Sequence, residues 1–175
     1  MNRYYKNVIL CGEIDFYCLL CEESFELAEQ VERHIRWEQH RKNIKNLSYI
    51  PKYKKDCIFM IGKYYYCEIC NYVTTSVKQV KNHINDSTHL FRTKNPIITQ
   101  KASDVTRNKN GLIKYHNMIM SKFEWHGIVN NHCFLCNTSV ENVEHVKQRD
   151  HMIALVQSEM RKVKENEYNR KVKAF

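Results

Sequence analysis

The sequence predicts an α+β protein made of three copies of a small ββα-type unit, rather than one domain around a single large core. Six of its eight cysteines form three C-x-x-C pairs, and two histidines separated by five residues follow each pair. A glycine and an apolar stretch precede each pair, the glycines being Gly12, Gly62 and Gly127. Each unit is therefore expected to begin with a strand, a glycine turn and a second strand.

The paired cysteines and histidines are spaced as metal ligands. The first two repeats share the spacing C-x2-C-x12-H-x5-H, and the third has C-x2-C-x8-H-x5-H. Two thiolates and two imidazoles form a common four-coordinate zinc site. We therefore predict three zinc ions, each stapling a finger that is too small to be held by its own core. The predicted ligands are Cys18, Cys21, His34 and His40, then Cys67, Cys70, His83 and His89, and then Cys133, Cys136, His145 and His151.

The five-residue gap between the histidines predicts a kinked helix in each finger. Residues six apart on an ideal α-helix differ by about 240° in direction, so two such histidines do not share a face. In the second repeat the gap contains Asn85, Asp86, Ser87 and Thr88, which are poor residues for a helix interior. The helix is therefore expected to break or distort between the two ligands.

The third repeat lacks four residues between its cysteines and its histidines. Removing four helical residues shortens the rotation by about 400°, which is close to a whole turn, so His145 would keep its direction on a helix one turn shorter. Two alternatives stay open: a degenerate finger that binds metal poorly, and a site in which His132 substitutes as a ligand. We expect the third zinc ion to be the weakest bound.

Other residues of ligand or aromatic type fall outside the repeated spacing. Cys11 and Cys57 are interpreted as small buried apolar residues. His116 and His126 are interpreted as surface or packing residues. The run Tyr64–Tyr66 predicts a strand with one buried face, and a stacking platform for bases is the alternative.

Residues 18–40 and 67–89 resemble the matrin-type and double-stranded-RNA-binding zinc fingers, which are relatives of the finger in a spliceosomal small-nuclear-ribonucleoprotein protein. The resemblance implies a ββα unit with a kinked helix around zinc. It also implies a nuclear protein that binds structured RNA, RNA–protein complexes or protein partners. The fingers cover about half of the chain, and the segments between them are unmatched.

The predicted organisation places basic or polar segments between the fingers. The spacing of Leu112, Tyr115, Ile119 and Phe123 predicts a short helix before the third finger, and an amphipathic stripe predicts a C-terminal helix. The predicted parts are finger 1 with an acidic helix at 8–45, a basic linker at 46–56, finger 2 at 57–92, a flexible linker at 93–111, the short helix plus finger 3 at 112–151, and an amphipathic basic helical tail at 152–175.

Charge is distributed unevenly along this chain of net charge +9. Residues 13–40 contain eight acidic and two basic residues, whereas residues 41–63 contain seven basic and one acidic residue. Phosphate would be repelled by the first segment and attracted by the second. Tyr49 and Tyr53 among the linker lysines suggest phosphate and stacking contacts, with a solvated basic linker as the alternative. The predicted nucleic-acid contacts are Lys52, Lys54, Lys55, Lys78, Lys81, Arg92 and Lys94.

The function expected from these features is nucleic-acid binding in the nucleus, and the resemblance places structured or double-stranded RNA ahead of DNA. The alternative is a protein adaptor in a chromatin or RNA-processing complex, which would bind its partner through the C-terminal helix or through Glu22, Glu26 and Glu29 of finger 1. We do not expect an enzyme, because closed four-ligand sites leave no open metal position. The chain has no apolar run long enough for a membrane span, so no membrane partner is expected.

Overall fold

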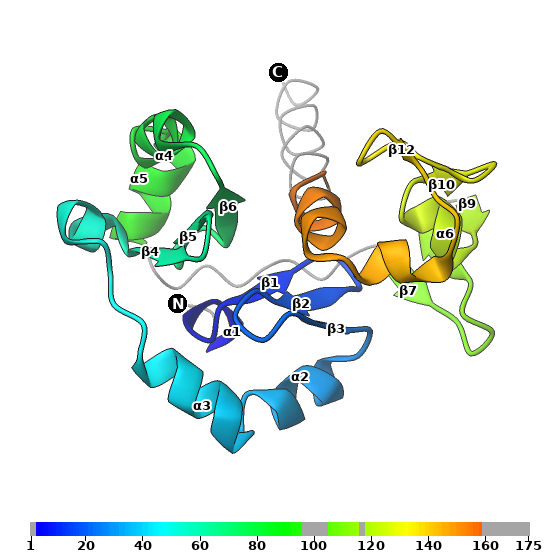
Figure 1. Ribbon diagram of the computed structural model, residues 1–175, viewed down its shortest axis with the longest axis horizontal. Helices are drawn as coiled ribbons and strands as arrows, with labels where there is room; N and C mark the ends of the chain where they lie inside the picture. Colours follow the sequence, from blue (N-terminus) through cyan, green and yellow to red (C-terminus); the bar gives the residue numbers. More distant parts are fainter. Residues whose placement is uncertain (1–2, 96–104, 116–117, 159–175) are drawn as a thin grey trace. The chain divides into compact units, whose positions relative to one another are not determined.

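The computed structural model describes residues 3–95, 105–115 and 118–158 (Figure 1). The described residues form two compact units. The first unit contains residues 3–11 and 16–95 and carries fingers 1 and 2. The second contains residues 12–15, 105–115 and 118–158 and carries finger 3. The mixed α+β class and the three small finger sheets with their helices agree with the sequence prediction.

Finger 1 is built on a three-stranded antiparallel sheet with strand order β1-β2-β3. Its core gathers Tyr5, Ile9, Val31 and Ile35 around the first cysteine, Cys18. A three-residue β3 closes the sheet, although the sequence predicted only two strands. The elements are α1 (Arg3–Lys6), β1 (Ile9–Cys11), β2 (Phe16–Cys18), β3 (Glu23–Phe25), α2 (Ala28–His34) and α3 (Glu38–Lys45).

Finger 2 repeats this plan with a longer hairpin. Gly62 makes its turn with φ 56°, a left-handed conformation that glycine adopts without strain. Tyr64 and Tyr66 are buried on β5 and Tyr65 is half-buried, which matches the strand predicted for the tyrosine run. The elements are η1 (Pro51–Asp56), β4 (Ile58–Ile61), β5 (Tyr64–Cys67), β6 (Tyr72–Thr74), α4 (Val77–Ile84) and α5 (Ser87–Lys94).

The finger helices break between their two histidines, as the spacing predicted. In finger 1, α2 ends at His34 and α3 begins at Glu38. In finger 2, the carboxylate of Asp86 accepts a 2.8 Å hydrogen bond from the Thr88 backbone N–H. This bond caps α5 and starts a new helix three residues after α4 ends. The break turns the second histidine back toward the cysteines.

The second unit contains a sheet that the sequence pattern did not predict, followed by finger 3. This sheet has the strand order β7-β8-β9, and the finger sheet has the order β10-β11-β12. The elements are β7 (Val105–Arg107), β8 (Ile113–Tyr115), β9 (Met118–Met120), α6 (Lys122–Trp125), β10 (Ile128–Val129), β11 (His132–Cys133), β12 (Thr138–Ser139), η2 (Val143–Lys147) and a helical segment over residues 149–158.

The helix predicted over residues 112–123 is wrong for most of its length, because β8 and β9 occupy residues 113–115 and 118–120. Asn108 and Gly111, which has φ 77°, close a turn that returns the chain along β7. A helix begins only where Ser121 and Glu124 form a capping box. The strand β7 also lies within the predicted linker 93–111, whose residues 96–104 are outside the described chain.

Gly127 does not make the hairpin turn of finger 3. It precedes β10 with φ 72°, and Asn130 and Asn131 form the turn with φ 49° and 58°. Asparagine tolerates this left-handed conformation better than other non-glycine residues, so the turn needs no glycine. The predicted helical tail is described only to residue 158, where Met152, Leu155 and Val156 are buried.

Fingers 1 and 2 are joined within the first unit by a buried polar contact. Asn71 follows the C-x-x-C of finger 2 with φ 56° and is 1% exposed. Its Oδ1 accepts from the Cys11 backbone N–H at 2.8 Å, and its Nδ2 donates to the Ile9 carbonyl at 2.7 Å. Strand β1 is at the edge of its sheet, so the backbone groups on its outer side have no neighbouring strand to bond with. The Asn71 side chain supplies hydrogen bonds to two of these groups. The hydroxyl of Tyr66 extends the contact by donating to the Tyr5 carbonyl at 2.9 Å.

Candidate metal centres

The structure brings the twelve sequence-predicted ligands together as three separate clusters. In each cluster the ligand atoms of two cysteines and two histidines lie within 4.8 Å of one another. The first cysteine of each pair stands at the end of a strand, at β2, β5 or β11. The second cysteine lies in the tight turn that follows, and the residue directly after it is left-handed in each finger, as Glu22, Asn71 or Asn137.

Distances within the clusters match the edges of a zinc tetrahedron. Zinc–sulfur bonds of about 2.3 Å and zinc–nitrogen bonds of about 2.0–2.1 Å place sulfur and nitrogen ligands about 3.5 Å apart. In finger 1 the sulfurs of Cys18 and Cys21 lie 3.6 and 3.4 Å from Nδ1 of His40. The corresponding distances are 3.6 and 3.5 Å to His89 in finger 2, and 3.5 and 3.6 Å to His151 in finger 3.

The first histidine of each of fingers 1 and 2 offers a buried nitrogen that lacks a protein partner. Nε2 of His34 and Nε2 of His83 are buried and form no hydrogen bond with the described residues. The other nitrogen of His34 is occupied, because Nδ1 lies 3.1 Å from Oε2 of Glu23. A buried ring nitrogen without a hydrogen-bond partner costs free energy. A metal ion bound to each of these two nitrogens would remove that cost.

Electrostatics favour a neutral second histidine in fingers 1 and 3 and disfavour a metal-free thiolate at Cys18. Burial, together with the charge of the neighbouring histidine, lowers the pKa of His40 and of His151 to about 4. Both imidazoles are therefore neutral near pH 7, as metal ligation requires. Burial raises the pKa of the Cys18 thiol to about 12. A divalent cation would supply the positive charge that buried thiolates lack.

The third cluster is assembled by a different local structure. His145 lies on the 3-10 helix η2 rather than on the shortened α-helix that the spacing predicted. Its Nε2 lies 3.2 Å from Nδ1 of His151, close to the separation of about 3.3 Å expected for two nitrogen ligands of one zinc ion. His132 is not part of the cluster, and its ring packs edge-on against Phe134.

The cysteines outside the repeated pattern are not part of any cluster found among the described residues. Cys11 is buried on β1, and burial raises its thiol pKa to about 12. Cys57 is half-buried in a left-handed conformation with φ 53°. His126 is also buried, stacking on the ring of the ligand His151 at 5.2 Å. The packing interpretation of His126 is therefore correct, but its proximity to a zinc ligand was not anticipated.

The predicted nucleic-acid contacts occupy the outside of finger 2, with one exception. Lys52, Lys54 and Lys55 of η1 are exposed, as are Lys78 and Lys81 of α4 and Lys94 of α5. Arg92 is half-buried and donates to the carbonyl of Cys70 at 3.3 Å, so it also braces the cysteine knuckle.

The linker tyrosines pack within the first unit. Tyr53 is only 6% exposed and belongs to the core of finger 2. Tyr49 stacks on Phe59 at 4.3 Å, and its hydroxyl donates to Oε2 of Glu68 at 2.7 Å. The predicted role in stacking on bases is therefore wrong for Tyr53, whose ring is buried. For Tyr49 the contacts with Phe59 and Glu68 already occupy the ring and the hydroxyl, which disfavours that role.

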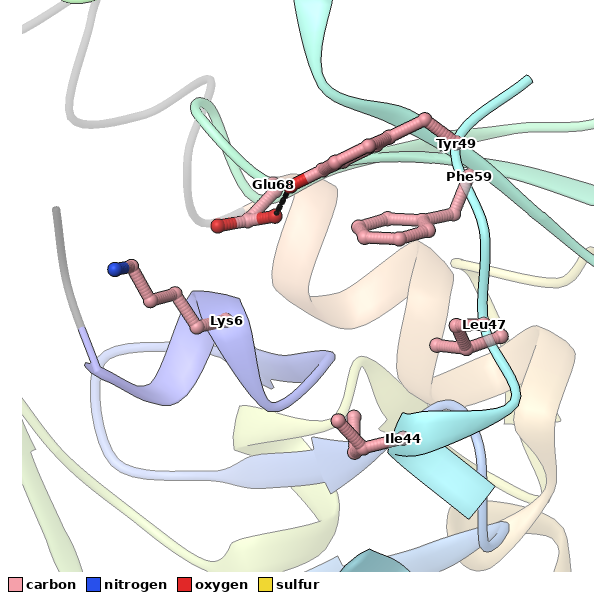
Figure 2. A pocket seen from close by; sticks show the side chains of 6 residues that line it. All are labelled: Lys6, Ile44, Leu47, Tyr49, Phe59 and Glu68. Atoms are coloured by element: carbon pink, nitrogen blue, oxygen red, sulfur yellow. Dashed lines mark hydrogen bonds between the residues drawn. The ribbon is translucent and has the colours of Figure 1, made fainter. Parts of the chain in front are cut away.

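Tyr49 and Phe59 also line a shallow pocket of about 340 Å³ in the first unit. Figure 2 shows the two rings on one side of this pocket, Ile44 and Leu47 on another, and the ends of Lys6 and Glu68 at its rim. The pocket lies between residues of finger 1 and finger 2. Its lining combines apolar, aromatic and oppositely charged side chains, and this combination does not indicate a particular class of ligand.

Comparison with known proteins supports the zinc-finger interpretation for finger 2. A family model described as a zinc-finger of C2H2 type matches residues 65–85. No curated protein and no solved structure matches the chain. Together, the family match and the three Cys2His2 clusters make this a zinc-binding protein with sites for up to three ions. Within the described residues, no helix is long and apolar enough to cross a membrane.

Proposed function

We propose that the protein binds nucleic acid in the nucleus, with structured or double-stranded RNA preferred over DNA. The contact surface is formed by η1, α4 and α5 of finger 2. The preference for RNA and the nuclear location rest on the resemblance of fingers 1 and 2 to the matrin-type and double-stranded-RNA-binding fingers. The contact surface rests on the charges of the described residues.

The observation that carries this proposal is the different ion pairing of fingers 1 and 2. Finger 1 neutralises much of its own positive charge. Oε2 of Glu32 lies 2.8 Å from Arg3 and 3.8 Å from Arg36, and Glu38 lies 2.8 Å from Lys42. Three further acidic residues of this finger, Glu22, Glu26 and Glu29, are exposed. Phosphate would meet repulsion here.

Finger 2 leaves its positive charge available. Five exposed lysines form no ion pair with any residue that the structure describes. The helix α5 adds an exposed aromatic ring, since Phe91 is 58% exposed beside Arg92. Phosphate contacts beside an aromatic surface suit a nucleic acid with accessible bases at its loops or ends. The lysines are Lys54, Lys55, Lys78, Lys81 and Lys94.

The test compares two sets of substitutions in the zinc-loaded full chain. Changing Lys52, Lys54 and Lys55 together to Ala should weaken binding to double-stranded RNA, and it should reduce the salt dependence of log K by about one for each lost phosphate contact. The matched set changes Glu22, Glu26 and Glu29 to Gln. It should leave RNA affinity unchanged or slightly higher, because it removes repulsion.

Fluorescence anisotropy with RNA and DNA duplexes of equal length, over a series of salt concentrations, measures both quantities. RNA should compete better than DNA, because 2′-hydroxyl groups and A-form shape distinguish the two. Absence of measurable affinity for either duplex at low salt would refute nucleic-acid binding.

A second candidate function, a protein adaptor, is favoured by the surface of finger 1. Leu27 is 54% exposed and Trp37 is 51% exposed, and both lie among the acidic residues of this finger. Exposed aromatic and aliphatic residues with a charged rim are typical of protein interfaces. Pull-down from nuclear extract with and without nuclease separates the two functions, since adaptor partners should persist after nuclease treatment.

In both functions we propose that zinc is structural. Each cluster provides four protein ligands, which closes the tetrahedron and leaves no position for a substrate or a reactive water molecule. The role of the metal is then to fold the fingers and to hold their surfaces in place.

A further inference from the structure

Each finger is preceded by the same backbone motif, which the ligand spacing does not reveal. A helical turn ends, one residue adopts a left-handed conformation, and an isoleucine follows that pairs with the first cysteine ligand. The left-handed residues are Val8, Cys57 and Gly127, with φ 56°, 53° and 72°. The pairs that follow them are Ile9 with Cys18, Ile58 with Cys67 and Ile128 with Cys133.

Backbone hydrogen bonds repeat along with the conformation. The N–H of each left-handed residue donates three residues back, to Tyr5, Lys54 or Glu124, at 3.0, 3.2 and 2.9 Å. Its carbonyl accepts from the residue after the first cysteine, which is Leu19, Glu68 or Phe134, at 3.2, 3.1 and 2.9 Å. The repeated unit therefore begins with this helical turn, and finger 3 retains it despite its shortened ligand spacing.

One side chain position in this motif faces the zinc site in all three fingers. The residue immediately before the left-handed one is Asn7, Asp56 or His126. Each places a polar atom near Nε2 of the second histidine, the nitrogen that points away from the cysteines. The distances are 3.4 Å from Asn7 Oδ1 to His40, 3.5 Å from Asp56 Oδ1 to His89, and 3.0 Å from His126 Nδ1 to His151. The contacts of Asn7 and His126 are hydrogen bonds, whereas Asp56 lies at an ion-pair distance and Nε2 of His89 forms no hydrogen bond with the described residues.

We propose that this position is an orienting acceptor for the second zinc histidine of each finger, and that its chemical identity sets how firmly that finger holds zinc. With Nδ1 bound to the metal, the histidine carries its proton on Nε2 and donates it to this acceptor. Such a partner fixes the ring orientation and increases the basicity of the ligand nitrogen. The chain uses an amide, a carboxylate and an imidazole for the same task.

Details of fingers 1 and 3 support an acceptor role rather than simple packing. The Asn7 amide nitrogen donates to the Arg3 carbonyl at 3.0 Å, which leaves its oxygen directed at His40. In the second unit the far nitrogen of His126 lies 3.7 Å from Oδ2 of Asp15, so a carboxylate stands behind this imidazole. If Nδ1 of His126 accepts a hydrogen bond from His151, the proton of the neutral His126 ring must lie on Nε2. The carboxylate of Asp15 beside Nε2 favours this tautomer.

A carboxylate acceptor increases the basicity of the ligand nitrogen more than a neutral amide does, so zinc binding should be stronger with a carboxylate at this position. Replacing Asp56 by Leu should weaken zinc binding in finger 2 by about 10- to 100-fold, and replacing it by Asn should weaken binding less. The reciprocal change Asn7→Asp should strengthen zinc binding in finger 1. Glu141→Leu, which removes an exposed carboxylate that belongs to none of the three clusters, is the control and should change neither finger.

The experiment follows zinc removal by a competing chelator in the full chain, using finger-specific amide signals in NMR spectra. Long-range proton–nitrogen spectra of the imidazoles report the bound nitrogen directly. His40, His89 and His151 should coordinate through Nδ1 and carry a slowly exchanging proton on Nε2. In Asp56→Leu the Nε2 proton of His89 should exchange faster while the control leaves it protected.

Two results would overturn the proposal. One is coordination of the second histidines through Nε2, which would leave nothing for the acceptor to bind. The other is unchanged zinc retention in both Asp56→Asn and Asn7→Asp, two isosteric changes that preserve packing. Should Asp56→Leu prevent finger 2 from folding, Asn7→Asp alone decides the question, because a purely structural residue would not strengthen zinc binding.

Discussion

Asn71 provides a quantitative test of whether fingers 1 and 2 behave as one body. The change Asn71→Gly keeps the left-handed backbone but removes three hydrogen bonds, to Cys11 N–H, to the Ile9 carbonyl and to the Tyr66 hydroxyl. Each such bond contributes about 0.5–1.5 kcal/mol net, so their loss should cost about 1.5–4.5 kcal/mol. The upper part of this range applies where the abandoned partners stay buried and unpaired.

Asn137 supplies the matched control. It occupies the same place after the third C-x-x-C, with φ 52°, but it is exposed. Replacement by glycine relieves strain in the left-handed backbone and increases the conformational entropy of the unfolded chain. Both effects change the stability of Asn71→Gly and Asn137→Gly alike. The difference between the two variants therefore isolates the hydrogen bonds of the Asn71 side chain, two of which reach finger 1.

Amide hydrogen exchange of the zinc-loaded chain measures this difference locally. Exchange at the Cys11 amide should accelerate by about 10- to 1,000-fold in Asn71→Gly, since each factor of ten corresponds to about 1.4 kcal/mol. It should not change in Asn137→Gly, and native mass spectrometry should show the same zinc content in both. Equal protection of Cys11 in the two variants would refute the joined arrangement.

Three further predictions concern the metal and the turns. Native mass spectrometry should find three zinc ions, with one lost in Cys133→Ser; two ions in the native chain and no loss in the variant would reject the third site. Cys67→Ser should unfold finger 2, because a structural zinc ion contributes on the order of 10 kcal/mol, and unchanged amide dispersion would contradict this. Gly127→Ala should destabilise finger 3 more than Gly111→Ala destabilises its own turn in thermal unfolding. Both alter a left-handed glycine, but only at Gly127 would the new Cβ lie 3.1 Å from Leu135 Cγ.

The sequence was sufficient for the features that ligand chemistry dictates. Four zinc ligands at regular spacing determine which residues converge, and the poor helix formers between His83 and His89 indicate where the helix breaks. Hydrophobic spacing was a weaker guide. Leu112 and Ile119 fit a helical stripe, yet residues 113–115 and 118–120 pair as strands, because the turn at Gly111 returns the chain on itself.

Contacts between distant parts of the sequence could not have been derived from local pattern. Asn71 looks like an ordinary turn residue until its side chain meets strand β1, 60 residues earlier in the chain. The acceptors Asn7, Asp56 and His126 share no residue type, so no motif links them. The available signal was the isoleucine two positions later in N-V-I, D-C-I and H-G-I, which becomes meaningful only once the left-handed middle residue is known.

The segment before finger 2 shows how these contacts bear on function. If this segment were a flexible linker, its lysines would lose conformational entropy on binding a phosphate backbone. In the structure, Tyr53 anchors η1 in the core of finger 2, and the Ile50 N–H donates to the Ile58 carbonyl at 2.9 Å. Lys54 and Lys55 therefore project from an ordered helical turn, and the ordering cost of binding is reduced in advance. Because Asp56 ends the same turn beside His89, the zinc site and the basic surface of finger 2 depend on one short segment.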